Sequence, residues 1–364
     1  MVASALLLRI DGRCQSGKPG PVLSFPAYNI VPPSDRYGSG IKYRNQWCYR
    51  YCFVWRDRIA SLGHRRGAHI VGYDSRSSNY QEGSQRVRFK YLAEVSYDGT
   101  DYNGFQLQPK CPTIQGSIER ALKNYCGLSR EELIVQGAAR TDSGVHARQQ
   151  FVEFYSSRQL QQEDFVRSLN RMLPASIAVH SLRHVEESFN VRYSQGKIYT
   201  YDIHLSSIRD PFACRYRHVP RHPGDLNIDA IKMACPLFVG TKDFRLLTNA
   251  TRDDCQTPEH DTTRHMYQVD VERMKDGLRI AVMGKGFMYK QVRNMAGVLL
   301  AVGVDKITLD DVEILLQGDV TRAGTLKSKY KVAEAKGLTL QRVFLQDEPV
   351  PNEHCVFELL KNER

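Results

Sequence analysis

Alternating apolar and polar residues occur in several segments after about residue 88, and this pattern is typical of half-buried β-strands. The clearest example is "RFKYLAEVSYD" at 88–98, which ends in the turn-rich sequence "YDGTDYNG". Apolar alternation on both sides of "KDG" (275–277) predicts a β-hairpin over 265–287. Further strands are predicted at 133–137, 149–155, 177–185, 196–205 and 337–345.

Apolar residues at helical spacing predict five helices, at 113–127, 163–174, 226–240, 289–303 and 308–318. Pro236 is expected to end or bend the third helix, and Thr308 is expected to cap the fifth. The apolar stripes of the first two helices are Ile118, Leu122 and Tyr125, and Phe165, Leu169 and Met172.

The predicted strands and helices do not alternate strictly along the chain. This order argues against a doubly wound parallel sheet and favours an α+β fold with helices packed on a sheet. We expect two α/β subdomains, at 87–195 and 196–346, whose largely antiparallel mixed sheets meet at a central cleft. A C-terminal tail is expected over 347–364.

Positive charge is concentrated in the N-terminal segment. The chain has 51 Lys+Arg and 40 Asp+Glu, a net charge of +11. Residues 1–86 hold 13 of the basic residues and 5 of the acidic residues. Few acids, many arginines and the start "MVASALLLRI" are typical of a transit peptide. We therefore interpret residues 1–86 as a basic extension that directs the protein to a plastid or mitochondrion. The alternatives are a disordered extension or a mis-predicted gene start, with the protein in the cytoplasm or the nucleus.

Several site types find no support in the residues. Nine irregularly spaced cysteines predict reduced thiols in an intracellular compartment, and Cys48 and Cys52 lack the further ligands of a zinc site. No apolar run approaches the roughly 20 residues that span a bilayer. The phosphate-loop and dinucleotide motifs are absent, and the H-x-E at His184 lacks the P-C-x-x-C of zinc deaminases. We therefore expect no membrane span, no metal and no small-molecule cofactor.

One motif, "GAARTDSGVHARQQFVEF" at 137–154, places Asp142 between Arg140 and His146 just before a predicted strand. An aspartate in a glycine-containing turn often bonds its own backbone. Alternatively, the loop presents a reactive carboxylate that Arg140 holds by electrostatic pairing. The motif alone leaves both interpretations open.

This motif resembles the catalytic motif of the TruA-type tRNA pseudouridine synthase family, and four further segments resemble that family in the same order. Three residues depart from those usual in the family but keep size or aromatic character. They are Ala139 and Ser143 in this motif and Phe105 in the first of the further segments. The further segments are "YDGTDYNGFQLQP" (97–109) with the helix "TIQGSIERAL" (113–122), "GKIYTYDI" (196–203), "GFMYKQVRNMAGVLLAVG" (286–303) and "AKGLTLQRVFL" (335–345).

The resemblance implies an isomerase that converts uridine in tRNA to pseudouridine without a cofactor. Asp142 would be the catalytic carboxylate, and Arg140 and Arg293 would support it. Tyr199 would stack on the target base, which must leave the helical stack to react. Lys290, which we place on the same helix face as Arg293, is a weaker candidate for phosphate contact. The predicted cleft would then bind RNA.

From the residues alone, other interpretations of these side chains exist. Tyr199 also fits a core aromatic, because Tyr201 lies on the same face of the predicted strand. Arg293 also fits a solvated charge on a helix. His146 is assigned to structure or RNA positioning, not to general-base catalysis.

The resemblance makes tRNA the expected partner and its anticodon stem-loop the leading target. It is compatible with a homodimer. The rival hypotheses are a catalytically inactive RNA-binding or tRNA-folding protein on the same fold, and a metal-dependent base-modifying enzyme.

Overall fold

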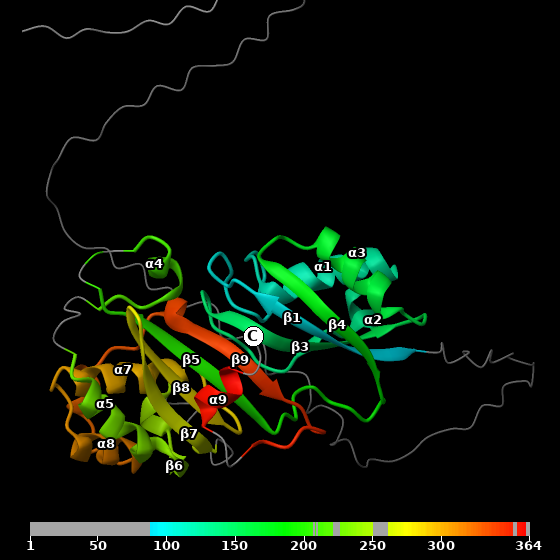
Figure 1. Ribbon diagram of the computed structural model, residues 1–364. Coiled ribbons are helices and arrows are strands. Elements are labelled where there is room, and N and C mark those ends of the chain that lie inside the picture. The colour runs from blue at the N-terminus through cyan, green and yellow to red at the C-terminus, as the bar shows by residue number, and fades with distance from the viewer. Residues whose placement is uncertain are drawn as a thin grey trace, which may run out of the picture. The chain divides into compact units, whose positions relative to one another are not determined.

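The computed structural model describes residues 88–206, 208, 210–220, 226–249, 261–351 and 355–361. The extension predicted at 1–86, its interpretation as a transit peptide, and the pair Cys48 and Cys52 therefore lie outside the described residues. Within them, a mixed β-sheet runs through the protein and carries helices at both of its ends (Figure 1).

The sheet has nine strands, and eight of them follow the order β4-β1-β3-β9-β5-β8-β7-β6, with β2 paired to β3. All neighbouring strands are antiparallel except β3 and β9. The strands are β1 (Phe89–Tyr97), β2 (Gln136–Gly137), β3 (His146–Ser156), β4 (Ile177–Val185), β5 (Gly196–His204), β6 (Gly240–Asp243), β7 (Thr263–Met274), β8 (Gly277–Gly284) and β9 (Leu338–Phe344).

The parallel pair β3 and β9 joins the two halves of the sheet. His146 pairs with Thr339 and Ala147 with Leu340, so a strand near the C-terminus lies beside the strand that follows the Asp142 loop. On its other side β9 pairs with β5. The two predicted subdomains therefore share one continuous sheet.

Six helices form two groups, one at each end of the sheet: α1, α2 and α3 at one end, and α5, α7 and α8 at the other, whereas α4 and α9 lie apart from both groups (Figure 1). The α-helices are α1 (Ile114–Cys126), α2 (Arg130–Leu133), α3 (Gln162–Met172), α4 (Ala213–Tyr216), α5 (Ile228–Ala234), α7 (Gln291–Gly303), α8 (Leu309–Leu316) and α9 (Val356–Lys361). Short 3-10 helices are η2 (Cys235–Phe238), η3 (Arg245–Leu247), η4 (Leu326–Ser328) and η5 (Ala335–Gly337).

Capping residues explain where several helices begin and end. The Thr308 side chain accepts from the Asp311 backbone N–H at the start of α8, as the sequence predicts. Gly127 ends α1 in the left-handed conformation, with φ of 69°. Pro236 ends α5 and stands in the 3-10 turn η2 that follows it.

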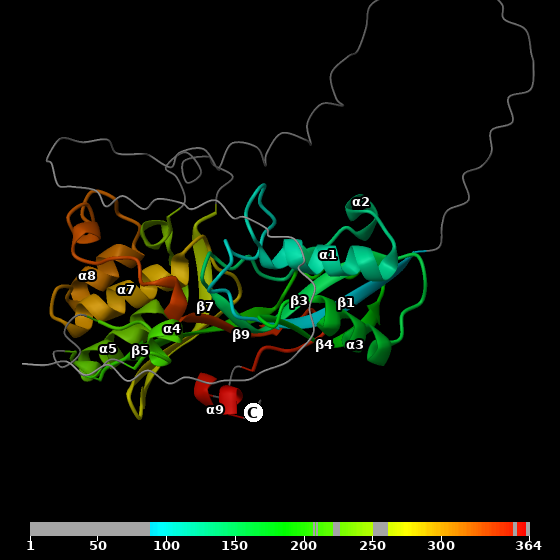
Figure 2. The same ribbon diagram turned by 90° about the horizontal axis from the view of Figure 1, so that it is seen from above.

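The two faces of the C-terminal half-sheet carry different cores. Tyr199 and Val282 pack into the large core that includes residues of α7. Their neighbours Ile198 and Met283 point to the other face, where Phe357 of α9 covers them. Helices α7 and α9 accordingly lie on opposite sides of the sheet (Figure 2).

The α+β class and the largely antiparallel mixed sheet are confirmed, and the predicted central cleft stays a prediction. Met172 is wrongly placed in the core stripe, because it is the last residue of α3 and is 47% exposed. The predicted strand at 133–137 shortens to β2, since Leu133 belongs to α2. Helices α2, α4 and α9 and strand β6 were not predicted.

None of the described helices is long and apolar enough to cross a membrane. The five cysteines in the described part of the chain are free thiols.

Candidate active site

Asp142 lies in the short loop between β2 and β3. The loop turns at Gly144, whose φ of 77° belongs to the left-handed region that favours glycine. The Val145 backbone N–H donates to the Asp142 carbonyl oxygen at 3.1 Å, which closes the turn. The motif therefore does form a turn, and this turn leaves the Asp142 carboxylate free for other contacts.

The segment after β1 supports the loop through hydrogen bonds. The Phe105 N–H donates to the Thr141 carbonyl oxygen at 3.0 Å, and the Gly144 N–H donates to the Tyr102 carbonyl oxygen at 3.3 Å. The Ser143 hydroxyl donates to the same Tyr102 oxygen at 3.1 Å. These hydrogen bonds join two motifs around Asp142, although Tyr102 and Ser143 are 41 positions apart in the chain.

A salt bridge connects the loop to α7. Arg293 Nη1 lies 3.0 Å from Asp142 Oδ2, and the two side chains are only 14% and 15% exposed. Arg293 Nε also donates to the Ala333 carbonyl oxygen at 2.8 Å. Charge-assisted hydrogen bonds of this kind fix orientation as well as charge. The Asp142 carboxylate therefore has a defined direction in the structure.

Tyr199 is the next side chain of the site. It lies on β5, is 7% exposed, and meets the Phe287 ring edge-on with 5.2 Å between ring centroids. Burial raises its pKa, and the nearby Tyr97 and Asp142 raise it further. The hydroxyl therefore keeps its proton at neutral pH and is able to donate a hydrogen bond.

Tyr97 completes the group, although the sequence did not single it out. Its hydroxyl lies 2.8 Å from Thr141 Oγ1, next to Asp142 in the chain. Burial raises the pKa of Tyr97 to about 12, although hydrogen bonds from Thr141 and Gln150 oppose the shift. Its position at the start of "YDGTDYNG" was the available signal. Phe287 was also missed, and it lies at the start of the segment that contains Arg293.

Comparisons with known proteins identify the family of the chain. The family model described as tRNA pseudouridine synthase matches residues 93–194 and 234–344. The chain belongs to the tRNA pseudouridine synthase family.

Curated relatives in this family match over almost their whole length. The chain is 37% identical over 251 residues to tRNA pseudouridine synthase A of Brevibacillus brevis, covering 68% of this chain and 96% of the relative. It is 33% identical over 259 residues to tRNA pseudouridine synthase A 1 of Protochlamydia amoebophila, covering 71% and 97%.

Among solved structures, the chain is similar to an archaeal box H/ACA sRNP Nop10-Cbf5 complex. The identity is 11% and the TM-score 0.26, with 67% of this chain and 61% of the other covered. A likeness of this size carries no conclusion about the site.

Two of the predicted site residues, Arg140 and Lys290, take no part in the contacts around Asp142. Arg140 is exposed, and among the described residues it makes no hydrogen bond or salt bridge. The carboxylate is therefore held by the arginine distant in sequence, and a supporting role for Arg140 stays a prediction.

Lys290 does not share a helix face with Arg293, because it precedes the first residue of α7 in a left-handed conformation with φ of 58°. Its ammonium group lies over the Tyr289 ring, 4.8 Å from the centroid. Its contact with phosphate stays a prediction.

His146 is the first residue of β3, and its side chain is buried against the segment that follows β1. Its Nδ1 accepts from the Gly99 N–H at 3.2 Å and lies 3.1 Å from Asp98 Oδ1. Burial lowers the pKa of His146, against the opposing effect of Asp98. Asp98 also accepts from Tyr216, which ties the end of β1 to α4.

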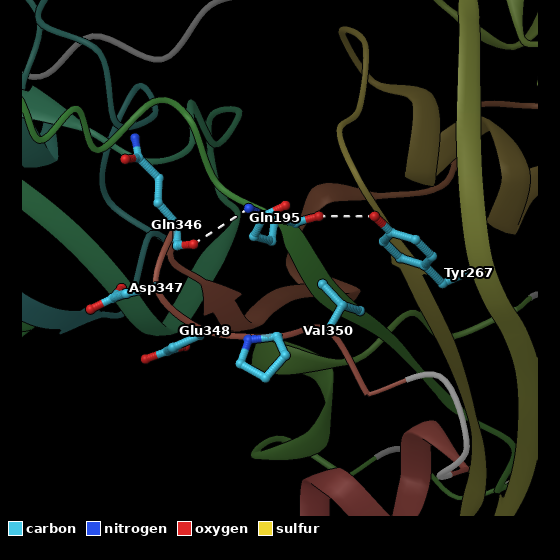
Figure 3. A pocket seen from close by; sticks show the side chains of 7 residues that line it. Gln195, Tyr267, Gln346, Asp347, Glu348 and Val350 are labelled. Atoms are coloured by element: carbon cyan, nitrogen blue, oxygen red, sulfur yellow. Dashed lines mark hydrogen bonds between the residues drawn. The ribbon is translucent and has the colours of Figure 1, made fainter.

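A pocket of about 480 Å³ lies elsewhere on the synthase, around the segment after β9 (Figure 3). Tyr267 donates to the Gln195 carbonyl oxygen at its edge. Its lining includes none of the residues around Asp142. In the described part of the chain, no three His, Cys, Asp or Glu side chains are placed to hold a metal ion.

Proposed function

We propose that this protein isomerises uridine to pseudouridine in tRNA at the Asp142 site. The observation that carries the proposal is the Asp142–Arg293 salt bridge next to the buried Tyr199. An oriented carboxylate, a fixed cation and an aromatic ring with a protonated hydroxyl provide what the isomerisation requires.

The reaction breaks the bond between N1 of uracil and C1′ of ribose, and C5 of the same base then bonds to C1′. Atoms balance within the nucleotide, because N1 gains a proton and C5 loses one. Asp142 acts either by attacking the nucleotide covalently or by steering a glycal route, and Arg293 keeps its carboxylate in place. Tyr199 stacks on the flipped base and has a hydroxyl proton within the site.

Replacing the carboxylate tests the chemistry directly. We expect Asp142→Ala to lower pseudouridine formation at least about 1,000-fold, the scale seen when a catalytic group is removed. The fold and most of the tRNA affinity should remain. Tritium release from labelled tRNA measures turnover, and filter binding measures affinity. The control is Asp101→Ala, whose carboxylate is 81% exposed. Turnover in Asp142→Ala near the wild-type rate would exclude this mechanism.

The proposal extends to the target and the location. The anticodon stem-loop follows from the resemblance, and a plastid or mitochondrial location follows from the composition of residues 1–86. Pseudouridine mapping in separated compartments of cells that lack the protein tests both points. For the oligomeric state, the proposal is a homodimer, which is compatible with the family resemblance. Light scattering of the purified protein measures the oligomeric state.

A further inference from the structure

A basic segment connects α8 to β9, and we call residues 320–337 the basic strap. Lys329 Nζ lies 3.2 Å from Asp311 Oδ2, and Lys336 Nζ lies 3.0 Å from Glu334 Oε2, so two of its cations are paired. Its five basic residues are Arg322, Lys327, Lys329, Lys331 and Lys336, and its one acid is Glu334.

Three cations of the basic strap have no such partner. Arg322, Lys327 and Lys331 are exposed, and none forms an ion pair with another residue in the ranges described. Exposed cations without counterions keep their full attraction for an anionic partner. The strap is therefore positively charged on its solvent side.

The basic strap crosses the helix that carries Arg293. A Cβ atom added at Gly297 would overlap with the Lys331 carbonyl oxygen, so the strap lies directly against α7. One turn before Gly297 on α7, the Arg293 carbonyl oxygen accepts from the Ala333 N–H at 3.1 Å. The Ala333 carbonyl oxygen in turn accepts from Arg293 Nε at 2.8 Å. The strap is thus fixed to the arginine of the site by two hydrogen bonds.

The end of the basic strap also lies against the Asp142 loop. A Cβ atom added at Gly144 would lie 3.3 Å from Ala335 Cβ. The strap therefore contacts the elements that carry both partners of the Asp142–Arg293 salt bridge, before it continues into β9 (Figure 1). Of its three free cations, Lys331 belongs to the part of the strap that lies against α7, one helical turn from Arg293.

We propose that the basic strap binds backbone phosphates of the RNA substrate next to the target nucleotide. The inference rests on the proposed function, and it assigns Arg322, Lys327 and Lys331 as phosphate contacts. Phosphate contacts fix the register of a protein on nucleic acid without reading its sequence. In this role the strap places the target uridine over Asp142, and the Ala333 contacts keep Arg293 aligned while RNA is bound.

The test is the double variant Lys327→Gln and Lys331→Gln, which keeps a polar side chain only slightly shorter than lysine and removes two charges. A lost phosphate contact reduces the slope of log affinity against log salt by about 1. We expect the slope for in-vitro transcribed tRNA to become less negative by about 2, and KM to rise about 10-fold. The kcat should stay within about two-fold, because the backbone contacts of Ala333 remain.

The matched control is Lys123→Gln with Arg171→Gln, which removes two exposed charges from α1 and α3. It should keep the wild-type slope and KM. Equal losses in both double variants would mean a general charge effect and would overturn the proposal, as would a strap variant with wild-type slope and KM. Wild-type protein that binds tRNA but forms no pseudouridine would instead count against the proposed function, and its salt slope would still test the strap.

Discussion

At the scale of single residues, Arg293 serves two acceptors with one guanidinium group. Nη1 reaches the Asp142 carboxylate, and Nε reaches the Ala333 carbonyl oxygen, which belongs to a different segment. A planar guanidinium can hold both directions at once, whereas a lysine ammonium is a point charge on a flexible stem. The geometry of the site thus depends on the shape of the cation as well as on its charge.

Arg293→Lys separates these two contributions. We expect kcat to fall about 100-fold, because small misplacements of reacting groups cost this much. KM for tRNA should change little, since the positive charge is kept. Single-turnover kinetics with labelled tRNA measures the effect, and Arg264→Lys, an arginine of β7, is the control. A kcat within about three-fold of wild type would show that charge alone suffices.

The sequence located Asp142, Arg293 and Tyr199 by resemblance, but it did not establish their contacts. Arg140 and Arg293 were both expected to hold Asp142, and among the described residues the contact is made by Arg293, 151 positions away, and not by Arg140, two positions away. Spacing along a loop does not report which side chain reaches the carboxylate, because the fold brings in distant partners. Asp142 was interpreted either as a turn residue or as a reactive carboxylate, and the two interpretations are compatible. Backbone groups close the turn, which leaves the Asp142 side chain free for other contacts.

At the scale of elements, helices with apolar periodicity and a cap were predicted well. The expected cap at Thr308 and stop at Pro236 are present. Helix α4 has only four residues, too few for a periodic signal, and depends on tertiary contacts. One of these contacts is the Asp98 carboxylate, which accepts from both Arg215 and Tyr216.

The contact between Asp98 and α4 is expected to depend on pH, because it requires the ionised Asp98 carboxylate. Burial alone would raise the pKa of Asp98, but hydrogen bonds from Thr100 and Tyr216 and the nearby His146 lower it to about 2, from 3.8. A lowered folded-state pKa contributes stability above about pH 4, and this is lost as pH falls towards 2. We expect Asp98→Asn to be less stable at pH 6 and to lose less stability between pH 4 and pH 2.

Urea unfolding at closely spaced pH values measures this dependence. Asp101→Asn removes a carboxylate from the same turn and serves as the control, because its side chain is 81% exposed and exposed pairs contribute little. Asp98→Asn curves parallel to wild type from pH 6 to pH 2 would contradict the expectation.

At the scale of the whole molecule, the sheet is completed by strands from both ends of the described chain. Strand β9 lies between β3 and β5, so the two halves of the sheet meet only after nearly the whole chain is in place. Local periodicity predicted each of these strands but not the parallel pairing, because that pairing involves residues about 190 positions apart. The continuity of the sheet is therefore a property of the long-range contacts.

Helix α9 covers the face of this sheet opposite Tyr199, and its removal tests what that cover contributes. Ending the chain after Pro351 removes Val356 and Phe357, which bury Ile198, Met283 and Phe344. Each buried apolar side chain contributes about 1.5–3 kcal/mol, so we expect the free energy of unfolding to fall by about 3–6 kcal/mol. The newly exposed apolar face should also promote self-association.

Below its lowered Tm, the shortened protein should keep its kcat, because the Asp142 site lies on the other face. Calorimetry, light scattering and the tritium-release assay measure the three effects. Glu358→Gln with Lys361→Gln is the control, since both side chains belong to α9 and lie outside its apolar contacts. An unchanged Tm after truncation would show that α9 is dispensable. A large loss of kcat in folded protein that keeps the wild-type oligomeric state would show instead that this face of the sheet influences the site on the other face.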